Sequence, residues 1–349
     1  MSNSTSINSA VSTLSKTSQI GPLVSVVTPV YNGQKFLAEC IDSILSQTYQ
    51  NWEYVIVDNR STDQTLDIAR RYAERDVRIR IYSNHEFVNM GENHNIAFRK
   101  ISPRSKYCKV LHADDWLFPN CLAEMVRVAE THPSVGVVGA YGLNGVRVTW
   151  DGLPYPSTLT PGRELCRRIL LGELYVFGSP TSHLIRSDLI RSRSAFYNTN
   201  EFHLAWMDQE ACYEVLQNSD FGFVHQVLTY TRQHDESATT SIARSGLNTD
   251  FPSQLILLKR YGPVYLHAEE YRKRLSDYLK LYYRFLGQSV LLRFKDGGFW
   301  QYHKRALEYV GFPLSFIQVA KASLLEVSDT LLNPFRMTAK VLGISKPAR

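Results

Sequence analysis

The feature that most constrains the fold is an alternation of short apolar runs with helical periodicity between residues 23 and 138. The apolar runs have the length and the β-branched content of buried strands, and the apolar residues between them recur at helical spacing. The runs are residues 23–28, 54–57, 79–82, 107–111 and 135–138. Strands that alternate with helices predict an α/β fold, in which a doubly wound, mostly parallel sheet is covered by helices on both faces.

Polar and acidic residues gather directly after four of these runs. They lie at residues 29–32, 58–59, 84–91 and 113–115. Ligands of doubly wound sheets bind in the crevice beyond the carboxyl ends of the strands. These four segments are therefore predicted to line the functional site.

The pattern changes in the last third of the chain, where long helical stretches such as residues 271–285 are rich in Tyr and Leu. We therefore predict a boundary near Arg244, with a catalytic domain at residues 21–244 and a helical C-terminal region at residues 245–349. Residues 1–20 are rich in Ser, Thr and Asn and lack the basic and apolar parts of a signal peptide, so they are predicted to form a disordered tail.

The composition indicates in which cellular compartment the protein lies. The chain has no stretch near the roughly 18 consecutive apolar residues of a spanning helix. Its five cysteines are scattered, odd in number and without a CxxC pair, which fits buried thiols in a reducing compartment better than disulfides or zinc. These features predict a cytoplasmic protein, either soluble or peripheral at the inner face of a membrane.

Positive charge is concentrated at the C-terminal end. From residue 251 onward the chain carries 16 Lys and Arg against 7 Asp and Glu, a local balance of +9, whereas the first 250 residues carry −3. A basic region beside a near-neutral body indicates an anionic partner, either a membrane surface or nucleic acid. A set of solvated helices explains the charge equally well, and no nucleic-acid-binding motif is present, so no nucleic acid is expected as a partner.

The acidic pair Asp114-Asp115 directly follows a predicted strand, so both carboxylates should lie at the crevice. Two like charges are tolerated best there with a cation between them and their ligand. Mn²⁺ or Mg²⁺, held by one carboxylate and bridging a diphosphate, would supply that charge. A solvated turn is the alternative for an isolated Asp-Asp pair.

Three residues after the first two runs have the chemistry of a nucleobase site. Tyr31 offers a flat aromatic face, and Asp58 and Asn59 lie beside it if the sheet is parallel. Stacking and an acceptor for the edge of the ring are what a base requires. An ordinary half-buried tyrosine is the alternative for Tyr31.

Two further segments carry candidate chemistry. Asp208 lies in an apolar and aromatic context, where a carboxylate is partly desolvated and becomes a better base than in water, with Glu210 as the alternative base. Arg232 and His234 follow the apolar run 223–230. A guanidinium can hold a diphosphate and a neutral imidazole can ligate a metal, although a histidine near a strand end is more often structural.

Six segments together resemble, in order and spacing, the family-two glycosyltransferases of the GT-A fold. The likeness covers residues 22–240, and each of its motifs is weak alone. The segments are VSVVTPVYNG (24–33), VIVDNRSTDQT (55–65), VLHADDWLFP (110–119), GSPTSHLIR (178–186), WMDQE (206–210) and LTYTRQHDES (228–237).

The resemblance implies roles for the acidic pair and for the base pocket. The metal-binding DxD-type motif of the family maps to residues 113–115, with Asp115 as the direct ligand, Asp114 nearer the ribose and Ala113 at the usual first acidic position. The base would lie against Pro29, Tyr31 and the family's acidic pair. That pair corresponds here to Asp58 and Asn59, and the amide leaves the identity of the base open.

The resemblance also implies the catalytic roles. Asp208 matches the catalytic base of the family's ED motif, with Met207 in place of the usual Glu. Arg232 corresponds to a phosphate contact and His234 to a metal ligand. Acceptor contacts are expected from residues 178–186 and from beyond the catalytic Asp.

These inferences predict a metal-dependent, inverting glycosyltransferase of surface polysaccharide or glycan biosynthesis. Its partners would be a nucleotide diphosphate sugar donor and a glycan or lipid-linked acceptor, with peripheral membrane contact or self-association through the C-terminal region. A nucleotidyltransferase is one alternative, but residues 28–33 contain one Gly and no basic residue. A non-catalytic nucleotide-sugar binding module is another, and it would tolerate loss of Asp208.

Overall fold

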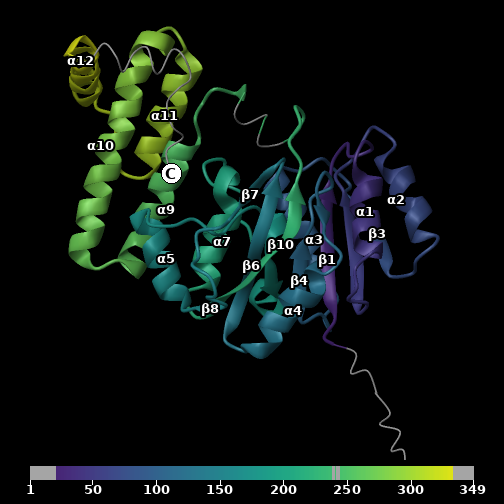
Figure 1. The fold of residues 1–349 in the computed structure, drawn as a ribbon. Helices are drawn as coiled ribbons and strands as arrows, with labels where there is room; N and C mark the ends of the chain where they lie inside the picture. Colours follow the sequence, from purple (N-terminus) through teal and green to yellow (C-terminus); the bar gives the residue numbers. More distant parts are fainter. Residues whose placement is uncertain (1–20, 238–239, 241–243, 333–349) are drawn as a thin grey trace, which may run out of the picture.

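The structure is a computed structural model that describes residues 21–332 except 238–239 and 241–243. The tail predicted at residues 1–20 therefore lies outside the described residues. A ten-stranded sheet runs through the described part of the molecule in the order β3-β2-β1-β4-β9-β6-β10-β5, with β7 paired to β6 and β8 to β10 (Figure 1). Its strands are β1 (Val24–Val30), β2 (Trp52–Asp58), β3 (Ile79–Ser83), β4 (Tyr107–Val110), β5 (Trp116–Leu117), β6 (Val135–Asn144), β7 (Arg147–Thr149), β8 (Leu159–Thr160), β9 (Leu184–Arg186) and β10 (Asp220–Thr231).

The sheet is mostly parallel, as the alternation of strands and helices predicts. Strands β1 to β4 pair in parallel, and so do β6 and β10, whereas β5, β7, β8 and β9 pair antiparallel with their neighbours. In β1, Val24 and Val26 belong to one hydrophobic cluster and Val27 to another on the opposite face. Both faces of the strand are thus covered, which explains why its sequence is a continuous apolar run rather than an alternating one.

Helices cover the two faces of the sheet. One cluster joins the sheet to α1 (Leu37–Leu45), α2 (Thr65–Ala73) and α4 (Cys121–Thr131). The other joins it to α3 (Met90–Arg99), α5 (Gly162–Leu171) and α7 (Met207–Val215). Short helical segments connect these elements, namely η1 (Pro180–Ser182), α6 (Ser187–Arg191) and η2 (Leu204–Trp206). The predicted α/β fold, doubly wound with helices on both faces, is confirmed.

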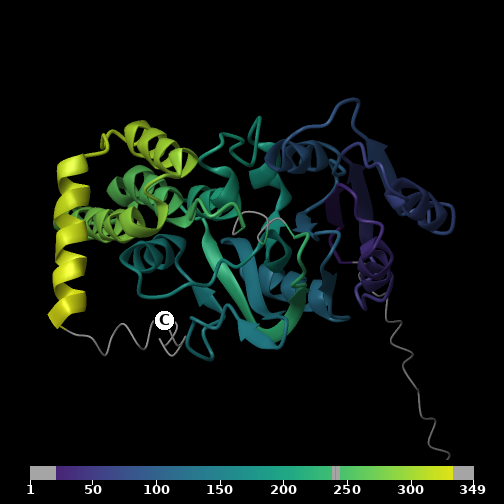
Figure 2. The ribbon, with the colours of Figure 1, turned by 90° about the horizontal axis from the view of Figure 1, so that it is seen from above.

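The predicted C-terminal helical region is present and packs at one end of the sheet (Figure 2). Its helices are α9 (Asp250–Tyr265), α10 (Ala268–Arg293), α11 (Gly297–Tyr309) and α12 (Phe316–Leu332). Tyr282 of α10 and Phe299 of α11 are fully buried in the same hydrophobic cluster as Val27 of the sheet. The two sides of the predicted boundary at Arg244 therefore share a core, and the division into domains remains a prediction.

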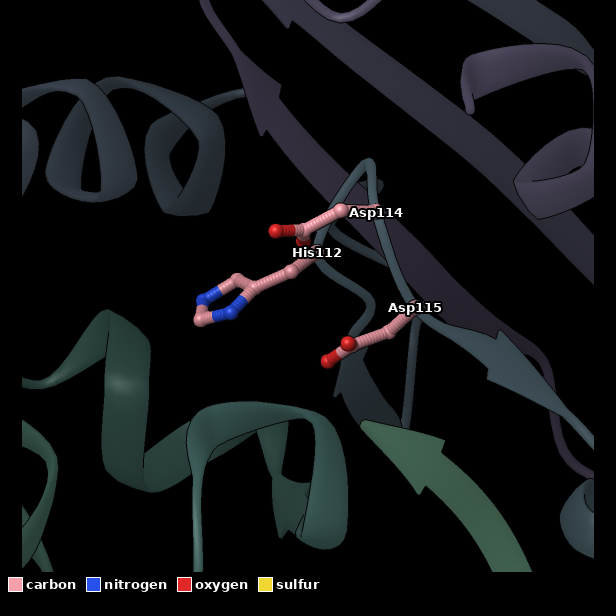
Figure 3. A group of neighbouring side chains, drawn as sticks. All are labelled: His112, Asp114 and Asp115. Atoms are coloured by element: carbon pink, nitrogen blue, oxygen red, sulfur yellow. The ribbon is translucent and has the colours of Figure 1, made fainter. Parts of the chain in front are cut away.

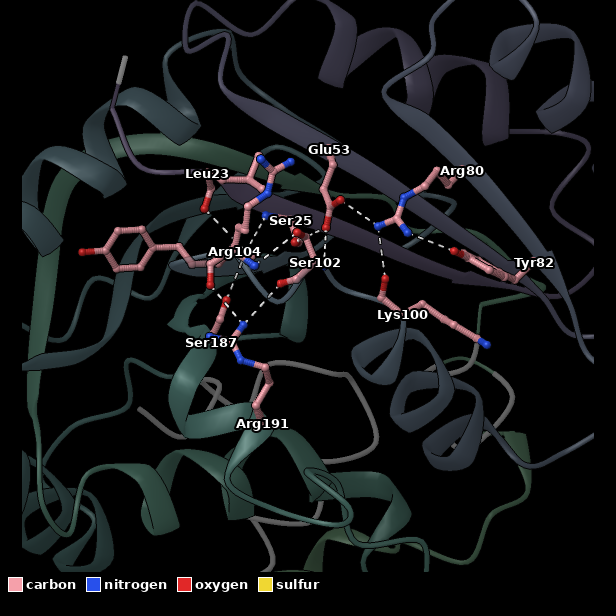
Figure 4. A network of polar contacts seen from close by, with 12 residues as sticks. Leu23, Ser25, Glu53, Arg80, Tyr82, Lys100, Ser102, Arg104, Ser187 and Arg191 are labelled. Atoms are coloured by element: carbon pink, nitrogen blue, oxygen red, sulfur yellow. Dashed lines mark hydrogen bonds and ion pairs between the residues drawn. The ribbon is translucent and has the colours of Figure 1, made fainter. Parts of the chain in front are cut away.

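A polar network lies at the amino ends of β1 and β2, at the opposite end of these strands from the predicted site (Figure 4). Glu53, near the start of β2, accepts hydrogen bonds from Ser25 Oγ at 2.5 Å and from the Ser102 backbone N–H at 2.6 Å, and it pairs with Arg80 at 2.7 Å. Arg80 also donates to the carbonyl of Lys100, just after α3, at 3.1 Å. These bonds tie α3 to the amino ends of β1 and β2, which leaves the carboxyl ends free to carry the site.

Among the described residues, none of the helices combines the length and the hydropathy that crossing a bilayer requires.

Candidate active site

Two adjoining cavities open at the carboxyl ends of the parallel strands. The first has a volume of about 340 Å³ and is lined by Pro29, Tyr31 and Asn59, and the second has a volume of about 690 Å³ and is lined by Asp115 and Asp208. Five residues line both cavities: Met90, His112, Asp114, His234 and Ser237. The segments predicted to meet at this edge do meet there, because the carboxyl ends of parallel strands lie along one edge.

The two aspartates after β4 have different surroundings. Asp115 is 3% exposed and accepts hydrogen bonds from Thr181 Oγ1 at 2.6 Å and from the backbone N–H of Arg232 at 3.0 Å. Burial, with the nearby charge of Asp114, raises the pKa of Asp115 to about 7. Asp114 is less buried, and its Oδ2 lies 2.9 Å from Nε2 of His234. An oxygen of Asp114 and an oxygen of Asp115 lie within 4.8 Å of each other. Two carboxylates at this separation are more stable with a cation bound between them than as two unpaired charges.

A third potential ligand, His112, joins this pair (Figure 3). One ring nitrogen of His112 and one oxygen from each of Asp114 and Asp115 lie within 4.8 Å of one another. Carboxylate oxygens with one imidazole suit a divalent cation such as Mn²⁺ or Mg²⁺. His234 lies beside the group, and its Nδ1 is buried without a hydrogen-bond partner among the described residues. The residues present therefore fit a metal ion.

Sequence reasoning missed His112, although its position two residues before Asp114 on the same turn was a usable signal. It also missed Thr181, which the chain brings to Asp115 from η1. The carbonyl of Thr181 accepts from the buried Lys109 Nζ at 2.6 Å, so the Lys109 side chain holds this segment against β4. Neighbouring residues 178–180 line the second cavity, where acceptor contacts are expected.

The first cavity has an aromatic entrance. Tyr31 is 50% exposed, and its ring meets Phe87 edge to face with centroids 4.9 Å apart. Pro29 and Asn59 line the same cavity, whereas Asp58 is buried, does not line it and accepts from the backbone N–H of Ser61 at 3.2 Å. Tyr31 is thus free to stack on a planar ligand, and Asp58 shapes the turn after β2.

The amide of Asn59 is already engaged. Its Oδ1 accepts from Asn84 Nδ2 at 2.9 Å and from the backbone N–H of Val88 at 3.0 Å, and its Nδ2 donates to the carbonyl of Val88 at 2.8 Å. A carbonyl oxygen has two lone pairs, so this Oδ1 has no acceptor capacity left for a base. In this arrangement Asn59 holds the segment that carries Phe87.

Asp208 and Glu210 face different surroundings in α7. Asp208 is in the first turn at the wall of the second cavity, and burial raises its pKa to about 6. Glu210 is 3% exposed and lies in an ionic network, 2.6 Å from His203 Nδ1 and 2.8 Å from Arg260. Among the two carboxylates, only Asp208 lines the cavity that adjoins the acidic pair.

Arg232 reaches the second cavity from the end of β10. Its guanidinium pairs with Glu39, donates from Nε to the carbonyl of Asp114 at 3.1 Å, and lies over the ring of Phe36 at 4.4 Å and of Trp116 at 4.9 Å. In this structure the guanidinium therefore supports the acidic pair. Its predicted contact with a phosphate, which would compete with Glu39, remains a prediction.

The mostly parallel sheet, the two cavities at its strand ends and the acidic pair agree with the GT-A glycosyltransferases that the sequence resembles. Residues 25–193 match the model of the family described as "Glycosyl transferase family 2". This part of the chain belongs to that family.

Relatives and solved structures agree with this assignment. EpsE of Bacillus subtilis is 33% identical over 159 residues, which are 43% of this chain and 56% of EpsE. The chain thus spans about half the length of that curated relative. TarS of S. aureus, solved with UDP-GlcNAc, superposes with a TM-score of 0.61 at 18% identity over 83% of this chain and 80% of TarS. The mannosyltransferase PcManGT of Pyrobaculum calidifontis, solved with GDP-Man and Mn²⁺, has a TM-score of 0.54 at 16% identity over 92% of this chain and 84% of PcManGT.

Proposed function

We propose that this protein transfers a sugar from a nucleotide diphosphate sugar to an acceptor hydroxyl, with inversion at the anomeric carbon. The observation that carries the proposal is the pair of adjoining cavities, which share His112, Asp114 and His234. One cavity has an exposed aromatic ring suited to a nucleobase, and the other has a carboxylate with a raised pKa. A donor bound across the shared wall would present its anomeric carbon to an acceptor in the second cavity.

In this proposal the first cavity binds the nucleoside. Tyr31 stacks on the base, Pro29 forms the floor beside it, and Asp58 and Asn59 shape the turn and the segment around it. Asp114 lies nearer the ribose. Asp115, with His112 and His234 beside it, would hold Mn²⁺ or Mg²⁺. The metal ion, when bound, neutralises charge that develops on the leaving nucleoside diphosphate.

Asp208 serves as the general base. Its raised pKa makes it a stronger base than a solvated aspartate, and it lines the cavity in which an acceptor hydroxyl would lie. Removal of the hydroxyl proton by Asp208 on one face, with departure of the diphosphate from the other, inverts the anomeric centre. Arg232 would add positive charge near the diphosphate if it exchanged Glu39 for a phosphate.

The comparisons support the donor class. TarS was solved with UDP-GlcNAc, and PcManGT with GDP-Man and Mn²⁺. We infer a donor of the same class, a nucleoside diphosphate sugar, with a divalent cation. A glycan or lipid-linked acceptor of surface polysaccharide biosynthesis is the substrate class that the family resemblance implies.

A panel of nucleotide sugars with Mn²⁺, scored by release of the nucleoside diphosphate, tests this function. The full chain should release nucleoside diphosphate from one donor when an acceptor is supplied. Asp208→Asn should release nucleoside diphosphate roughly 100-fold or more slowly, and Asp67→Asn on the exposed side of α2 should match the wild type. Release of pyrophosphate would instead indicate nucleotidyl transfer. Donor binding without any release would indicate a binding module.

We also propose peripheral contact with an anionic membrane through the C-terminal helices. Two aromatic residues of this region, Tyr282 and Phe299, are buried in the core and cannot contribute to such a contact. A different apolar face is exposed on α12 and at the end of α10. It consists of Leu292, Phe294, Phe316, Ile317, Leu324 and Leu325, each at least 68% exposed.

Basic residues accompany this apolar face. Lys280 and Lys321 line a groove of about 810 Å³ together with Leu325, and Phe294, Phe316 and Leu324 line a second groove of about 520 Å³. Apolar side chains beside lysines suit the headgroup layer of an anionic membrane. A second copy of the chain is the alternative occupant, which a size measurement would reveal.

A further inference from the structure

Two histidines meet beside the acidic pair. His94 on α3 is 3% exposed, and its Nε2 lies 3.1 Å from Nε2 of His112. The two rings are close to perpendicular, at 79°. Two ring nitrogens at this distance form a hydrogen bond only if one carries a hydrogen and the other a lone pair.

The other contact of His94 decides which ring donates. Its Nδ1 lies 2.8 Å from the carbonyl oxygen of Met90, one turn earlier in α3. A carbonyl oxygen only accepts, so Nδ1 of His94 carries a hydrogen. The ring is buried, which strongly disfavours a second hydrogen and a positive charge. Nε2 of His94 therefore holds a lone pair.

The hydrogen between the rings then belongs to Nε2 of His112. A neutral imidazole with its hydrogen on Nε2 has its lone pair on Nδ1. In Figure 3 the ring of His112 lies beside the two carboxylates, and the nitrogen on the side toward Asp115 is Nδ1, which is bonded to the ring carbon that carries the side chain. The lone pair is thus offered on the side of Asp115.

We propose that His94 is a positioning residue that holds His112 in the tautomer whose Nδ1 can ligate a divalent cation together with Asp114 and Asp115. The proposal rests on the proposed metal-dependent function. It also concerns the choice of metal. An imidazole ligand favours first-row transition metals over Mg²⁺, which prefers oxygen, so the contact between His94 and His112 biases the site away from Mg²⁺.

Two substitutions of His94 separate its hydrogen-bonding role from its packing role. His94→Leu fills the space but removes the acceptor, whereas His94→Gln keeps an acceptor oxygen. The metal-free full chain is titrated with Co²⁺ and separately with Mg²⁺ by calorimetry, and Co²⁺ is also followed by its visible absorption. His94→Leu should weaken Co²⁺ binding by about 10- to 100-fold, the range for lost outer-shell partners of a metal ligand, and Mg²⁺ binding by less. His94→Gln should retain most of the affinity.

His303→Leu is the matched control. His303 is also a buried histidine, at 0% exposure, but its Nδ1 lies 2.5 Å from the hydroxyl of Tyr282 in the C-terminal helices, away from the acidic pair. This variant should keep the Co²⁺ affinity of the wild type. An unchanged ratio of Co²⁺ to Mg²⁺ affinity in His94→Leu would overturn the proposal.

The tautomer can be read without any variant. In the ¹⁵N-histidine-labelled, metal-free protein, the imidazole nitrogen shifts of His112 should be those of a ring with its hydrogen on Nε2. A hydrogen on Nδ1 would overturn the proposal even if the variants of His94 fail to fold. A donor panel without any release, beside an intact Co²⁺ response, would contradict the transferase function and leave the histidine pair standing.

Discussion

Asp208 and Glu210 lie two positions apart in α7 and meet opposite surroundings. The Glu210 carboxylate pairs with Arg260 at 2.8 Å and lies 2.6 Å from Nδ1 of His203. The Asp208 carboxylate is desolvated without an ion-pair partner among the described residues, and its pKa rises to about 6. One helix thus carries both a carboxylate with a pKa near neutral pH and a carboxylate in a structural ion pair. The difference comes from the groups that surround each side chain.

Asp208→Asn should lower turnover by roughly 100-fold or more, because an amide cannot accept the acceptor's proton, while donor affinity is kept. In the wild type, activity should fall as the pH decreases through about 6, where Asp208 becomes protonated. Steady-state rates from pH 5 to 8 check both expectations. A variant Asp208→Asn with normal turnover would remove Asp208 from the mechanism.

The same substitution should stabilise the fold at neutral pH. The pKa of Asp208 is higher in the folded protein, at about 6, than its usual value of 3.8, so its stabilising contribution is complete below pH 3.8 and is lost as the pH rises through 6. Asp208→Asn removes the cost of the buried charge, which is at most about 3 kcal/mol at pH 7.5 for a shift of this size. Urea unfolding at pH 7.5 should show the gain, and at pH 3.5 the two proteins should be equally stable.

Asp115→Ala should abolish the Mn²⁺-dependent part of donor binding. The variant loses two hydrogen bonds, from Thr181 and from the Arg232 backbone, but it also loses a carboxylate that burial and Asp114 hold at a pKa of about 7. These effects oppose each other, so the protein should stay folded. Calorimetry with UDP and GDP, with and without Mn²⁺, decides. Equal affinities of variant and wild type in Mn²⁺ would contradict the role of Asp115.

At the scale of elements, the site depends on how strand ends are fastened to the loops and helices that follow them. Asn59, directly after β2, holds the 84–88 segment, and the Glu53 network holds the chain just after α3 and the start of β1 at the opposite ends of the strands. The 84–88 segment carries Phe87, which faces Tyr31. The aromatic entrance of the first cavity is therefore positioned by an amide rather than by its own packing.

Asn59→Asp, which restores the residue usual in the family, should loosen this segment. A carboxylate cannot donate to the carbonyl of Val88 and would repel it, at a cost of about 1–3 kcal/mol for an unsatisfied buried group. Hydrogen exchange of residues 84–88 should become faster, and UDP or GDP binding should weaken. Asn51→Asp, near the opposite edge of the sheet, is the control. Unchanged exchange in Asn59→Asp would mean that the amide does not anchor the segment.

At the scale of the whole molecule, the C-terminal helices both complete the core and present an outer surface. Tyr282 and Phe299 are buried against the rest of the protein, so removal of the chain beyond Arg244 would expose core side chains. Gly287 of α10 allows α12 to approach closely, because a Cβ there would lie 2.7 Å from the backbone nitrogen of Ser323. The exposed residues Phe316, Leu324 and Leu325 of α12 line grooves that residues of α10 also line.

Replacing Phe316, Leu324 and Leu325 by Ser should reduce binding to liposomes that contain anionic lipid, without unfolding the protein, because these side chains are exposed. Co-sedimentation at low and high salt measures the effect, and the electrostatic part should weaken at high salt. Val77→Ser, at 95% exposure on the sheet side of the molecule, is the control. If the triple variant binds liposomes as well as the wild type, the face is not a membrane contact. The same conclusion follows if the wild type and Val77→Ser are oligomeric and the triple variant is monomeric, because the face would then bind a second copy of the chain.

The sequence by itself determined the strand–helix alternation, the edge of the sheet at which the site forms and the candidate carboxylates. These follow from local periodicity and from the position of polar residues after apolar runs. Only the tertiary structure decided which partners those residues meet. His112 forms a hydrogen bond with His94 of α3, and the amide of Asn59 forms hydrogen bonds with residues 84 and 88. Glu210 forms an ion pair with Arg260. Such pairings join residues far apart in the chain, so periodicity carries no signal for them.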